Sequence, residues 1–291
     1  ANTVETLPMD RTITGSTATE KYYDFNLSIG KGVSILLSDF GSADLDLFLY
    51  KKSGSSYTQI AKATTNSSTE KIGKSLSYGD YRLKVLNFDK TNASYKITTK
   101  TTTTAQDAVV TTPNWFPPVL QPGEIAAVTV TATNGGTNIW TNAAGYKLGT
   151  TLDAPAFCNT EHLLAVSDSI EYDNEKVFRF NITAPRPTVQ QSYTLGFRMK
   201  QNTSFFGNTS TNTVSVAADF ETLPLGSKKI VSGDTEKWYK INITQSGNYA
   251  FRTLATTTKC DTELALYSSA MELLDINDDA YDTSTFSRYS K

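Results

Sequence analysis

The stretch that decides the fold is Thr19-Glu20-Lys21-Tyr22-Tyr23, because it recurs later in the chain as Thr235-Glu236-Lys237-Trp238-Tyr239. A second stretch, Glu5-Thr6-Leu7-Pro8, recurs at the same offset as Glu221-Thr222-Leu223-Pro224. Two matches at one offset indicate an internal repeat, which is a sign of tandem modules with a shared architecture. The third part of the chain is therefore predicted to copy the first.

Apolar residues alternate with polar ones directly after both copies of this stretch. They are Tyr23, Phe25 and Leu27 in the first copy and Tyr239, Ile241 and Ile243 in the second. Such alternation is typical of a half-buried β-strand, whose side chains point in turn to opposite faces. Another strand is predicted where Asp44-Leu45-Asp46-Leu47-Phe48-Leu49-Tyr50 aligns, after one inserted residue, with Asp261-Thr262-Glu263-Leu264-Ala265-Leu266-Tyr267.

The two copies differ at their ends. The first continues with two more strands, Gly79-Asp80-Tyr81-Arg82-Leu83-Lys84-Val85 and Tyr95-Lys96-Ile97-Thr98, whereas the second reaches Lys291 before either. Inner strands without these partners would keep unpaired edges. We therefore expect either that the native chain continues or that another molecule covers the edge, including a second copy that pairs edge to edge.

The middle of the chain predicts a separate module. Thr99 to Thr104 read as a threonine-rich tether, and Pro- and Gly-containing turns follow. The predicted strands carry these alternating residues: Ala126, Val128, Val130, Ala132; Phe178, Phe180, Ile182; Tyr193, Leu195, Phe197, Met199; Val214, Val216. With 291 residues the chain has room for two or three cores, at roughly 100–150 residues each. The prediction is an all-β fold of three β-sandwich modules in tandem at 1–102, 105–218 and 219–291, the first and third homologous and the third truncated.

Charge and cysteine content indicate which partners and which cellular compartment to expect. The formal charge is −2, from 27 basic and 29 acidic residues, and no Lys/Arg stripe is present, so nucleic acid is not an expected partner. No apolar run is long enough to cross a bilayer, and no transmembrane segment is predicted. Cys158 and Cys260 fall in different predicted modules and are interpreted as two buried thiols rather than a disulfide. Few cysteines among many Thr, Ser and Asn residues are typical of a bacterial exported protein.

The repeated motifs resemble the bacterial pre-peptidase C-terminal (PPC) domain. The resemblance in the first copy rests on Asp44 to Tyr50 and Gly79 to Val85, and in the second on Asp261 to Tyr267 and the turn Ile276-Asn277-Asp278-Asp279. The first copy lacks this turn and has Ala63-Thr64-Thr65-Asn66 instead. The resemblance implies an extracellular accessory module of the kind attached to secreted peptidases, and a relative in clostridial collagenases binds collagen and calcium.

The middle module is similar to immunoglobulin-like domains of the NBR1-like and bacterial cell-adhesion type. The similar residues are Val128-Thr129-Val130-Thr131-Ala132-Thr133-Asn134-Gly135-Gly136-Thr137 with Trp140, then Gly196-Phe197-Arg198-Met199 and Phe205-Phe206-Gly207. This resemblance implies an adhesion or spacer role.

No enzyme activity is predicted. His162 is the only histidine, which leaves no material for a His-based triad or a multi-His zinc site, and it is expected to be exposed or packed. Neither HExxH nor GxSxG occurs, and no carboxylate pair stands in a pattern that marks it for acid–base chemistry.

The candidate cation site is a run of oxygen donors: Asp275, Asn277, Asp278, Asp279 and Asp282. So dense a set could surround Ca²⁺, although its spacing is not that of an EF-hand. The alternative is an Asx-rich turn that hydrogen-bonds its own backbone. Two acidic pairs, Asp44 with Asp46 and Asp261 with Glu263, recur in the copies and could either bind metal or orient loops.

Aromatic residues near turns are candidate ligand-binding residues: Trp115, Phe116, Tyr78, Tyr146 and Tyr281. Each could instead pack onto its own module. Our primary interpretation is a non-catalytic secreted or cell-surface bacterial binding and adhesion protein, with a collagen-like protein or a polysaccharide as partner. The alternatives are the accessory region of a larger secreted hydrolase, most simply a peptidase, and a carbohydrate-binding surface protein.

Overall fold

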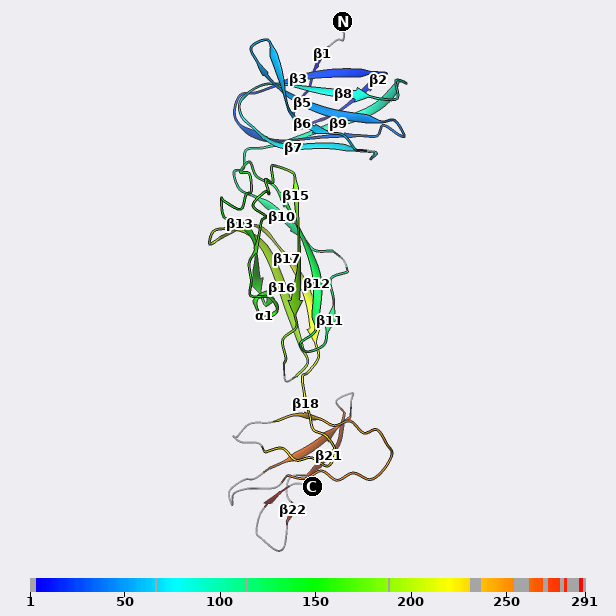
Figure 1. The fold of residues 1–291 in the computed structure, drawn as a ribbon, viewed down its shortest axis with the longest axis vertical. Helices are drawn as coiled ribbons and strands as arrows, with labels where there is room; N and C mark the ends of the chain where they lie inside the picture. Colours follow the sequence, from blue (N-terminus) through cyan, green and yellow to red (C-terminus); the bar gives the residue numbers. More distant parts are fainter. Residues whose placement is uncertain are drawn as a thin grey trace. The chain divides into compact units, whose positions relative to one another are not determined.

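The computed structural model describes residues 4–65, 67–113, 115–187, 189–230, 237–253, 262–268, 272–277, 280–281 and 288–289. The protein is all-β, since the only helix in these ranges, α1 (Ala154–Phe157), has four residues. The chain divides into two compact units, Ala1–Phe220 and Glu221–Lys291 (Figure 1). No helix in the described part is both long and apolar enough to cross a membrane.

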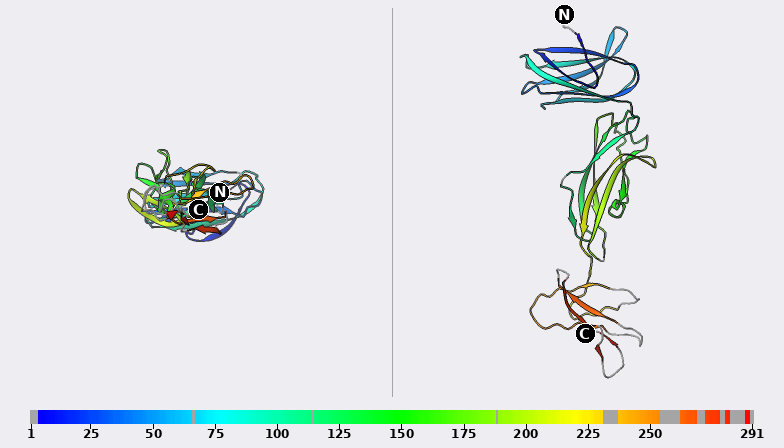
Figure 2. Two further views of the ribbon diagram at one scale, coloured as in Figure 1. Left: turned by 90° about the horizontal axis from the view of Figure 1, so that it is seen from below. Right: turned by 180° about the vertical axis from the view of Figure 1, so that it is seen from behind.

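The N-terminal sandwich, built from strands between residues 4 and 102, packs two sheets face to face (Figure 1; Figure 2). One sheet has the strand order β1-β3-β8-β5-β6, and the other has the order β2-β9-β4-β7. The strands are β1 Val4–Thr6, β2 Thr12–Thr17, β3 Glu20–Leu27, β4 Lys31–Ser38, β5 Leu45–Ser53, β6 Ser56–Ala63, β7 Glu70–Leu76, β8 Gly79–Asn87 and β9 Ala93–Thr102. The alternation predicted for β3 and β8 is confirmed, because its apolar residues are buried: Tyr23, Phe25, Leu27, Tyr81, Leu83 and Val85.

Two tyrosines tie these sheets together. The hydroxyls of Tyr23 on β3 and Tyr95 on β9 share a hydrogen bond of 2.9 Å inside the core. Burial raises the pKa of both phenols, so each hydroxyl keeps its proton. Gly15 makes room for the pair, since a Cβ there would lie 2.5 Å from the Tyr23 hydroxyl.

The predicted tether is wrong over residues 99–102. Strand β9 continues to Thr102 and pairs with β4 as far as Gly32. Thr99 is buried, and its hydroxyl donates to the Pro8 carbonyl oxygen at 2.9 Å. Because β-branched threonine favours extended backbone, a threonine-rich run can lengthen a strand as well as link two modules.

The middle sandwich has a sheet of order β10-β12-β15 and a sheet of order β11-β17-β16-β13-β14. The strands are β10 Ala108–Thr111, β11 Val119–Leu120, β12 Ile125–Asn134, β13 Tyr146–Leu152, β14 His162–Leu163, β15 Glu175–Thr183, β16 Gln191–Gln201 and β17 Ser204–Val216. The strands predicted around Val128, Phe178, Phe197 and Val214 are confirmed by β12, β15, β16 and β17. Its core is separate from that of the N-terminal sandwich.

The unit Glu221–Lys291 reproduces part of the N-terminal sandwich. Its strands are β18 Glu221–Thr222, β19 Tyr239–Lys240, β20 Leu264–Tyr267, β21 Leu273–Asn277, β22 Ala280–Tyr281 and β23 Arg288–Tyr289. The parallel pair Glu221↔Tyr239 repeats the parallel pair Glu5↔Tyr23. A register shift between Leu266 and Tyr267 repeats the one between Leu49 and Tyr50.

This second copy is less complete than predicted. The strand expected through Ile241 and Ile243 is only β19, and Ile243 is 50% exposed. None of the described apolar side chains of Glu221–Lys291 is buried. The physical reason lies in the first copy, where β8 pairs with both β3 and β5. No such strand joins β19 to β20 in the described part of the unit.

Candidate functional site

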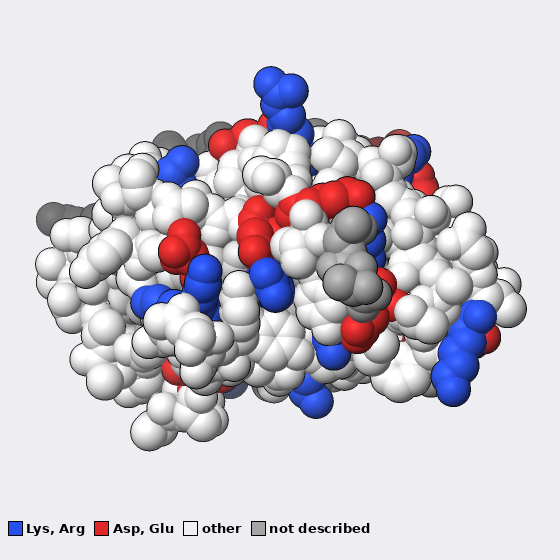
Figure 3. Space-filling model, turned by 90° about the horizontal axis from the view of Figure 1, so that it is seen from above, with Lys and Arg blue, Asp and Glu red and all other residues white. Residues whose placement is uncertain are grey.

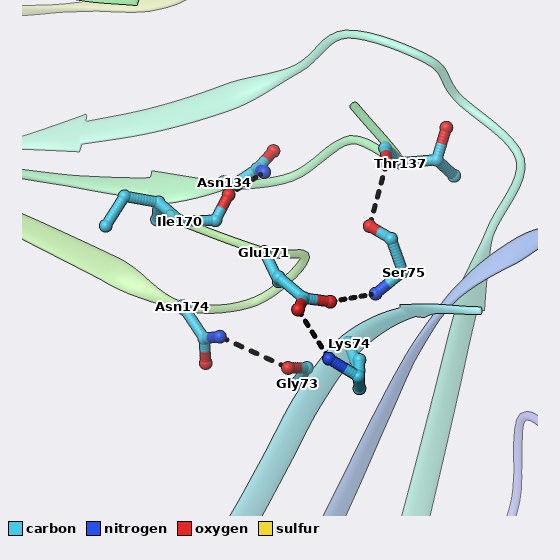
Figure 4. A network of polar contacts seen from close by, with 8 residues as sticks. All are labelled: Gly73, Lys74, Ser75, Asn134, Thr137, Ile170, Glu171 and Asn174. Carbon is cyan, nitrogen blue, oxygen red and sulfur yellow. Dashed lines mark hydrogen bonds and ion pairs between the residues drawn. The ribbon is translucent and has the colours of Figure 1, made fainter. Parts of the chain in front are cut away.

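The N-terminal and middle sandwiches meet at a loop of residues 170–174, which we call the joint loop (Figure 4). Glu171 forms an ion pair with Lys74 of β7 at 2.5 Å and accepts a hydrogen bond from the Ser75 backbone N–H at 3.0 Å. The Ser75 hydroxyl donates to the carbonyl oxygen of Thr137 at 2.7 Å. One carboxylate is thus held at both oxygens by the neighbouring sandwich.

The next residues of the joint loop add further contacts. Asp173 accepts a hydrogen bond from the Ser34 hydroxyl at 2.5 Å, and its carbonyl oxygen accepts one from Lys71 Nζ at 2.7 Å. Asn174 Nδ2 donates to the Gly73 carbonyl oxygen at 3.1 Å. Ser34 is buried, so this contact excludes water from the centre of the interface.

Two glycines let the joint loop approach the sheet. A Cβ on Gly32 would lie 2.5 Å from Cγ of Tyr172, and a Cβ on Gly73 would lie 2.3 Å from the Tyr172 carbonyl oxygen. Neither distance is tolerated by real atoms. The close approach therefore requires glycine at both positions.

Asn134 holds the joint loop from inside the middle sandwich. Its side chain is fully buried and donates to the carbonyl oxygens of Asn138 at 2.8 Å and Ile170 at 2.9 Å. Its Oδ1 accepts from the Gly136 N–H at 2.9 Å. A buried amide with all three partners fixes the loop before it meets the other sandwich.

The sheet on the other side of the N-terminal sandwich carries aromatic and basic residues on its outer surface, which we call the aromatic–cationic face. Its members are partly exposed: Tyr22, Phe48, Tyr50, Tyr57, Arg82 and Lys84. Arg82 Cζ lies 4.3 Å from the Tyr57 ring centre, and Lys84 Nζ lies 4.5 Å from that of Phe48. Asp24 holds Arg82 in a two-pronged contact at 2.6 and 2.7 Å.

The charge of this end of the molecule is mixed. Figure 3 shows acidic and basic side chains interspersed over a mainly uncharged surface. No patch of one sign dominates the view, in line with the formal charge of −2.

The first acidic pair lies at the rim of this sheet. Asp46 is buried, and its pKa is raised to about 6 by burial and then by the nearby charges of Asp44 and Glu70. Glu70 is also buried and accepts hydrogen bonds from the Thr65 backbone N–H at 2.8 Å and hydroxyl at 2.5 Å. The carboxylate that orients a loop by hydrogen bonds is thus Glu70, which the sequence did not single out.

The predicted calcium residues are only partly described. Asp275 lies exposed on β21, where its Oδ1 accepts from the Ile276 N–H at 2.9 Å, and Asn277 ends that strand. Asp261, Asp278, Asp279 and Asp282 lie outside the described residues, whereas Glu263 is exposed just before β20. Among the described residues no three His, Cys, Asp or Glu side chains gather as metal ligands. The calcium site stays a prediction.

The predicted ligand-binding aromatics divide into two groups. The packing alternative holds for Phe116, which is 6% exposed with its ring centre 6.1 Å from that of Phe197, and for Tyr146, which is 2% exposed. Tyr146 stacks on buried Trp140 in the core. An aromatic beside a turn still folds inward where a core gap accepts it.

Two of these aromatics are open to solvent. Tyr78 is 75% and Trp115 is 63% exposed. Tyr281 lies in β22, and its side chain is outside the described part. Trp115 lines a shallow groove of about 360 Å³ with Ala127 and Thr129 of β12 and Arg179 and Asn181 of β15. We call this the Trp115 groove.

The only histidine lies beside a cysteine. Cys158 Sγ is 3.5 Å from His162 Nε2 and 3.1 Å from Thr160 Oγ1. His162 stacks on Phe180 with 3.7 Å between ring centres, and burial lowers its pKa. Cys158 is partly exposed rather than buried as expected, and Cys260 lies outside the described residues.

No protein-family model matches the sequence, and no curated protein matches it. Among solved structures, the chain is similar to the pre-peptidase C-terminal domain of a Bacillus anthracis collagenase, at 19% identity over 34% of this chain and 97% of that one, with a TM-score of 0.31. It is similar to a Pyrococcus furiosus CARDB domain in complex with di-metal ions, at 20% identity over 40% and 99%, with a TM-score of 0.30.

A third similar structure covers more of the chain. It is that of the FN1–FN3 domains of chicken CNTN1, at 12% identity over 72% of this chain and 70% of that one, with a TM-score of 0.23. Because TM-scores this low assign neither family nor role, the all-β fold rests on the strands and cores described above.

Proposed function

We propose that this chain is a non-catalytic binding protein of the bacterial exterior, in which the N-terminal sandwich presents the aromatic–cationic face to an extracellular polymer. The observation that carries the proposal is the face itself. Its rings lie on a sheet, so their positions are set by strand pairing rather than by loops. Rigid aromatic side chains contribute contact area at low entropic expense, which is why they dominate binding surfaces.

The repeat supports this proposal. Trp238 stands at the repeat position of Tyr22, and Tyr267 stands at that of Tyr50. Their rings lie 5.1 Å apart in the unit Glu221–Lys291. An aromatic pair retained in both copies fits a shared binding role, because none of the described apolar side chains of the second copy is buried.

The joint between the sandwiches also fits the proposal. A surface that binds a fibre or a cell wall gains affinity when it is attached rigidly to the rest of the protein, because less orientational entropy is lost on binding. The contacts of Glu171, Asp173 and Asn174 attach the two sandwiches to each other in this way. The partner is a polymer with repeated units, either a collagen-like protein or a polysaccharide.

Cosedimentation of the 291-residue protein with insoluble collagen fibrils, and separately with insoluble polysaccharides, tests the proposal. Tyr57→Ala and Tyr50→Ala should weaken retention about tenfold, the effect of losing about 1.4 kcal/mol of contact energy. Phe88→Ala removes an aromatic residue that is 55% exposed in the turn after β8 and is the matched control. Retention on neither polymer, or equal retention of all variants, would overturn the proposal.

A further inference from the structure

The Trp115 groove holds a tryptophan that cannot withdraw into the core. Its neighbour Phe116 is anchored against Phe197, and the Phe116 N–H donates to the Pro113 carbonyl oxygen at 3.2 Å. These contacts fix the backbone on the C-terminal side of Trp115. A tryptophan left 63% exposed on a fixed turn leaves a large apolar ring in water that a ligand would cover.

The floor of the groove is made by strand pairing. Ala127 of β12 lies opposite Asn181 of β15, and Thr129 lies opposite Arg179. The β12 side of the groove carries the small side chains of Ala127 and Thr129, and the β15 side carries the polar side chains of Arg179 and Asn181. The groove therefore brings one aromatic ring and several hydrogen-bonding side chains to the same surface.

Among the described residues, the guanidinium of Arg179 has no partner. The side chain of Arg82 is paired with Asp24 and that of Arg186 with Asp219, but no described residue forms an ion pair or hydrogen bond with the Arg179 side chain. An unpaired guanidinium presents a planar fork of donors that matches a carboxylate in two contacts. The groove is therefore positively charged beside an aromatic ring, in a chain whose formal charge is −2.

We propose that the Trp115 groove binds a uronic-acid unit of an anionic polysaccharide. The apolar face of the pyranose ring stacks on Trp115, and the carboxylate pairs with Arg179. The Asn181 amide and the Thr129 hydroxyl supply both donors and acceptors for the ring hydroxyls. The inference rests on the proposed role of the chain as a binding protein, and it adds a second site of a defined ligand class on the middle sandwich.

Calorimetric titration of the full chain with an oligogalacturonide, and with the same oligomer after its carboxylates are reduced to alcohols, tests this site. We expect at least tenfold weaker binding of the reduced oligomer, and of Arg179→Gln with the native oligomer. Trp115→Ala should abolish binding, whereas Trp115→Phe should retain part of it. Affinity for the native oligomer should also fall as salt is raised, because the Arg179 pair is near the surface.

The controls separate this site from the aromatic–cationic face. Arg11→Gln changes an exposed arginine of the N-terminal sandwich and should bind like the wild-type protein, as should Tyr57→Ala. Equal affinity for the charged and reduced oligomers, or unchanged binding by Arg179→Gln, would overturn the inference. Retention on collagen together with no oligogalacturonide binding would overturn this site and leave the proposed function standing. If Tyr57→Ala loses oligogalacturonide binding and Trp115→Ala keeps it, the sugar binds to the aromatic–cationic face instead of the Trp115 groove.

Discussion

At the residue scale, two glycines, which have no side chain, determine how closely the sandwiches approach each other. Gly32 and Gly73 lie on neighbouring strands, β4 and β7, and Tyr172 occupies the space their side chains would fill. Nothing in the sequence around either glycine marks it, because neither is in a turn motif. The requirement arises only once a loop from residue 170 onward is placed against the sheet.

We expect Gly73→Ala to lower the free energy of unfolding of the first two sandwiches by about 1–3 kcal/mol, as overpacking does. The added Cβ would lie 2.3 Å from a backbone oxygen, which cannot move aside as a flexible side chain would. Chemical unfolding followed by intrinsic fluorescence gives the measurement. Gly30→Ala is the control, because its Cβ would meet nothing closer than 3.4 Å. Equal stability of the two variants would contradict the close contact.

Buried Asp46 predicts a pH dependence of stability. Its carboxyl has a pKa of about 6 in the folded state against 3.8 in its ordinary state, so the folded protein holds the proton between these values. The resulting stabilisation is complete below about pH 4 and is lost as the pH rises through about 6. Asp46→Asn should therefore be more stable than the wild type at pH 8, by on the order of 2 kcal/mol, and similar to it at pH 4. Urea unfolding at both pH values checks this, with exposed Asp80→Asn as control.

The contact between Cys158 and His162 predicts that the thiol of Cys158 is alkylated faster than it would be without the imidazole. His162 is held neutral near pH 7 by burial and lies within reach to accept the thiol proton. In a Cys260→Ser background, His162→Leu should slow labelling by iodoacetamide on the order of tenfold, the low end of general-base assistance. Mass spectrometry of the labelled peptide gives the rate. Thr160→Val serves as control, and an unchanged rate in His162→Leu would show that the imidazole does not assist.

At the element scale, the strands with a visible alternation could be predicted most directly, whereas a strand such as β4 could not. Strands β3, β8, β12 and β16 put every second residue in the core, so their pattern is visible in the sequence. Strand β4 places Val33, Ile35 and Leu37 inward, but Leu36 breaks its alternation. The sequence of residues 99–102 predicts a tether where the structure has a strand, because threonine is common to strands and linkers alike.

Hydrogen exchange should distinguish these two interpretations of residues 99–102. Their backbone amides pair with β4 inside a sheet, so we expect them to exchange as slowly as those of β8. The amides of β21, in the unit whose described residues include no buried apolar side chain, should exchange much faster. Deuterium uptake measured peptide by peptide checks both. Rapid exchange of the amides of residues 99–102 would show that these residues form a tether and not a strand.

At the scale of the whole molecule, the candidate site is partly visible in the sequence. Trp115 could be predicted as a ligand-binding residue because it is an aromatic residue beside Pro-rich turns. Arg179 and Asn181 were not, since they join Trp115 only through the pairing of β12 with β15. Pairing between distant strands is set by the full topology, which local periodicity does not contain.

The joint predicts a fixed orientation of the first two sandwiches. In a background without cysteine, spin labels at Gln59→Cys and Thr211→Cys should give a narrow distance distribution. Replacing Glu171 and Asp173 together by alanine should broaden it, because the ion pairs and hydrogen bonds with β4 and β7 are lost. The control is Glu5→Ala, which breaks an ion pair within the N-terminal sandwich. A broad distribution in the parent protein would contradict a stiff joint.

The register shift shared by the two copies has a consequence for ancestry. An extra residue in one strand disturbs pairing, so two strands rarely acquire it independently at the same place. The extra residue is Ile60 of β6, opposite Leu49 and Tyr50, and Leu274 of β21, opposite Leu266 and Tyr267, which dates it to before the duplication that produced the copies. The sequence Asn277-Asp278-Asp279, which has no counterpart at Ala63-Thr64-Thr65, diverged afterwards. Descendants of the same ancestor should therefore keep the irregular strand even where the acidic sequence has been lost.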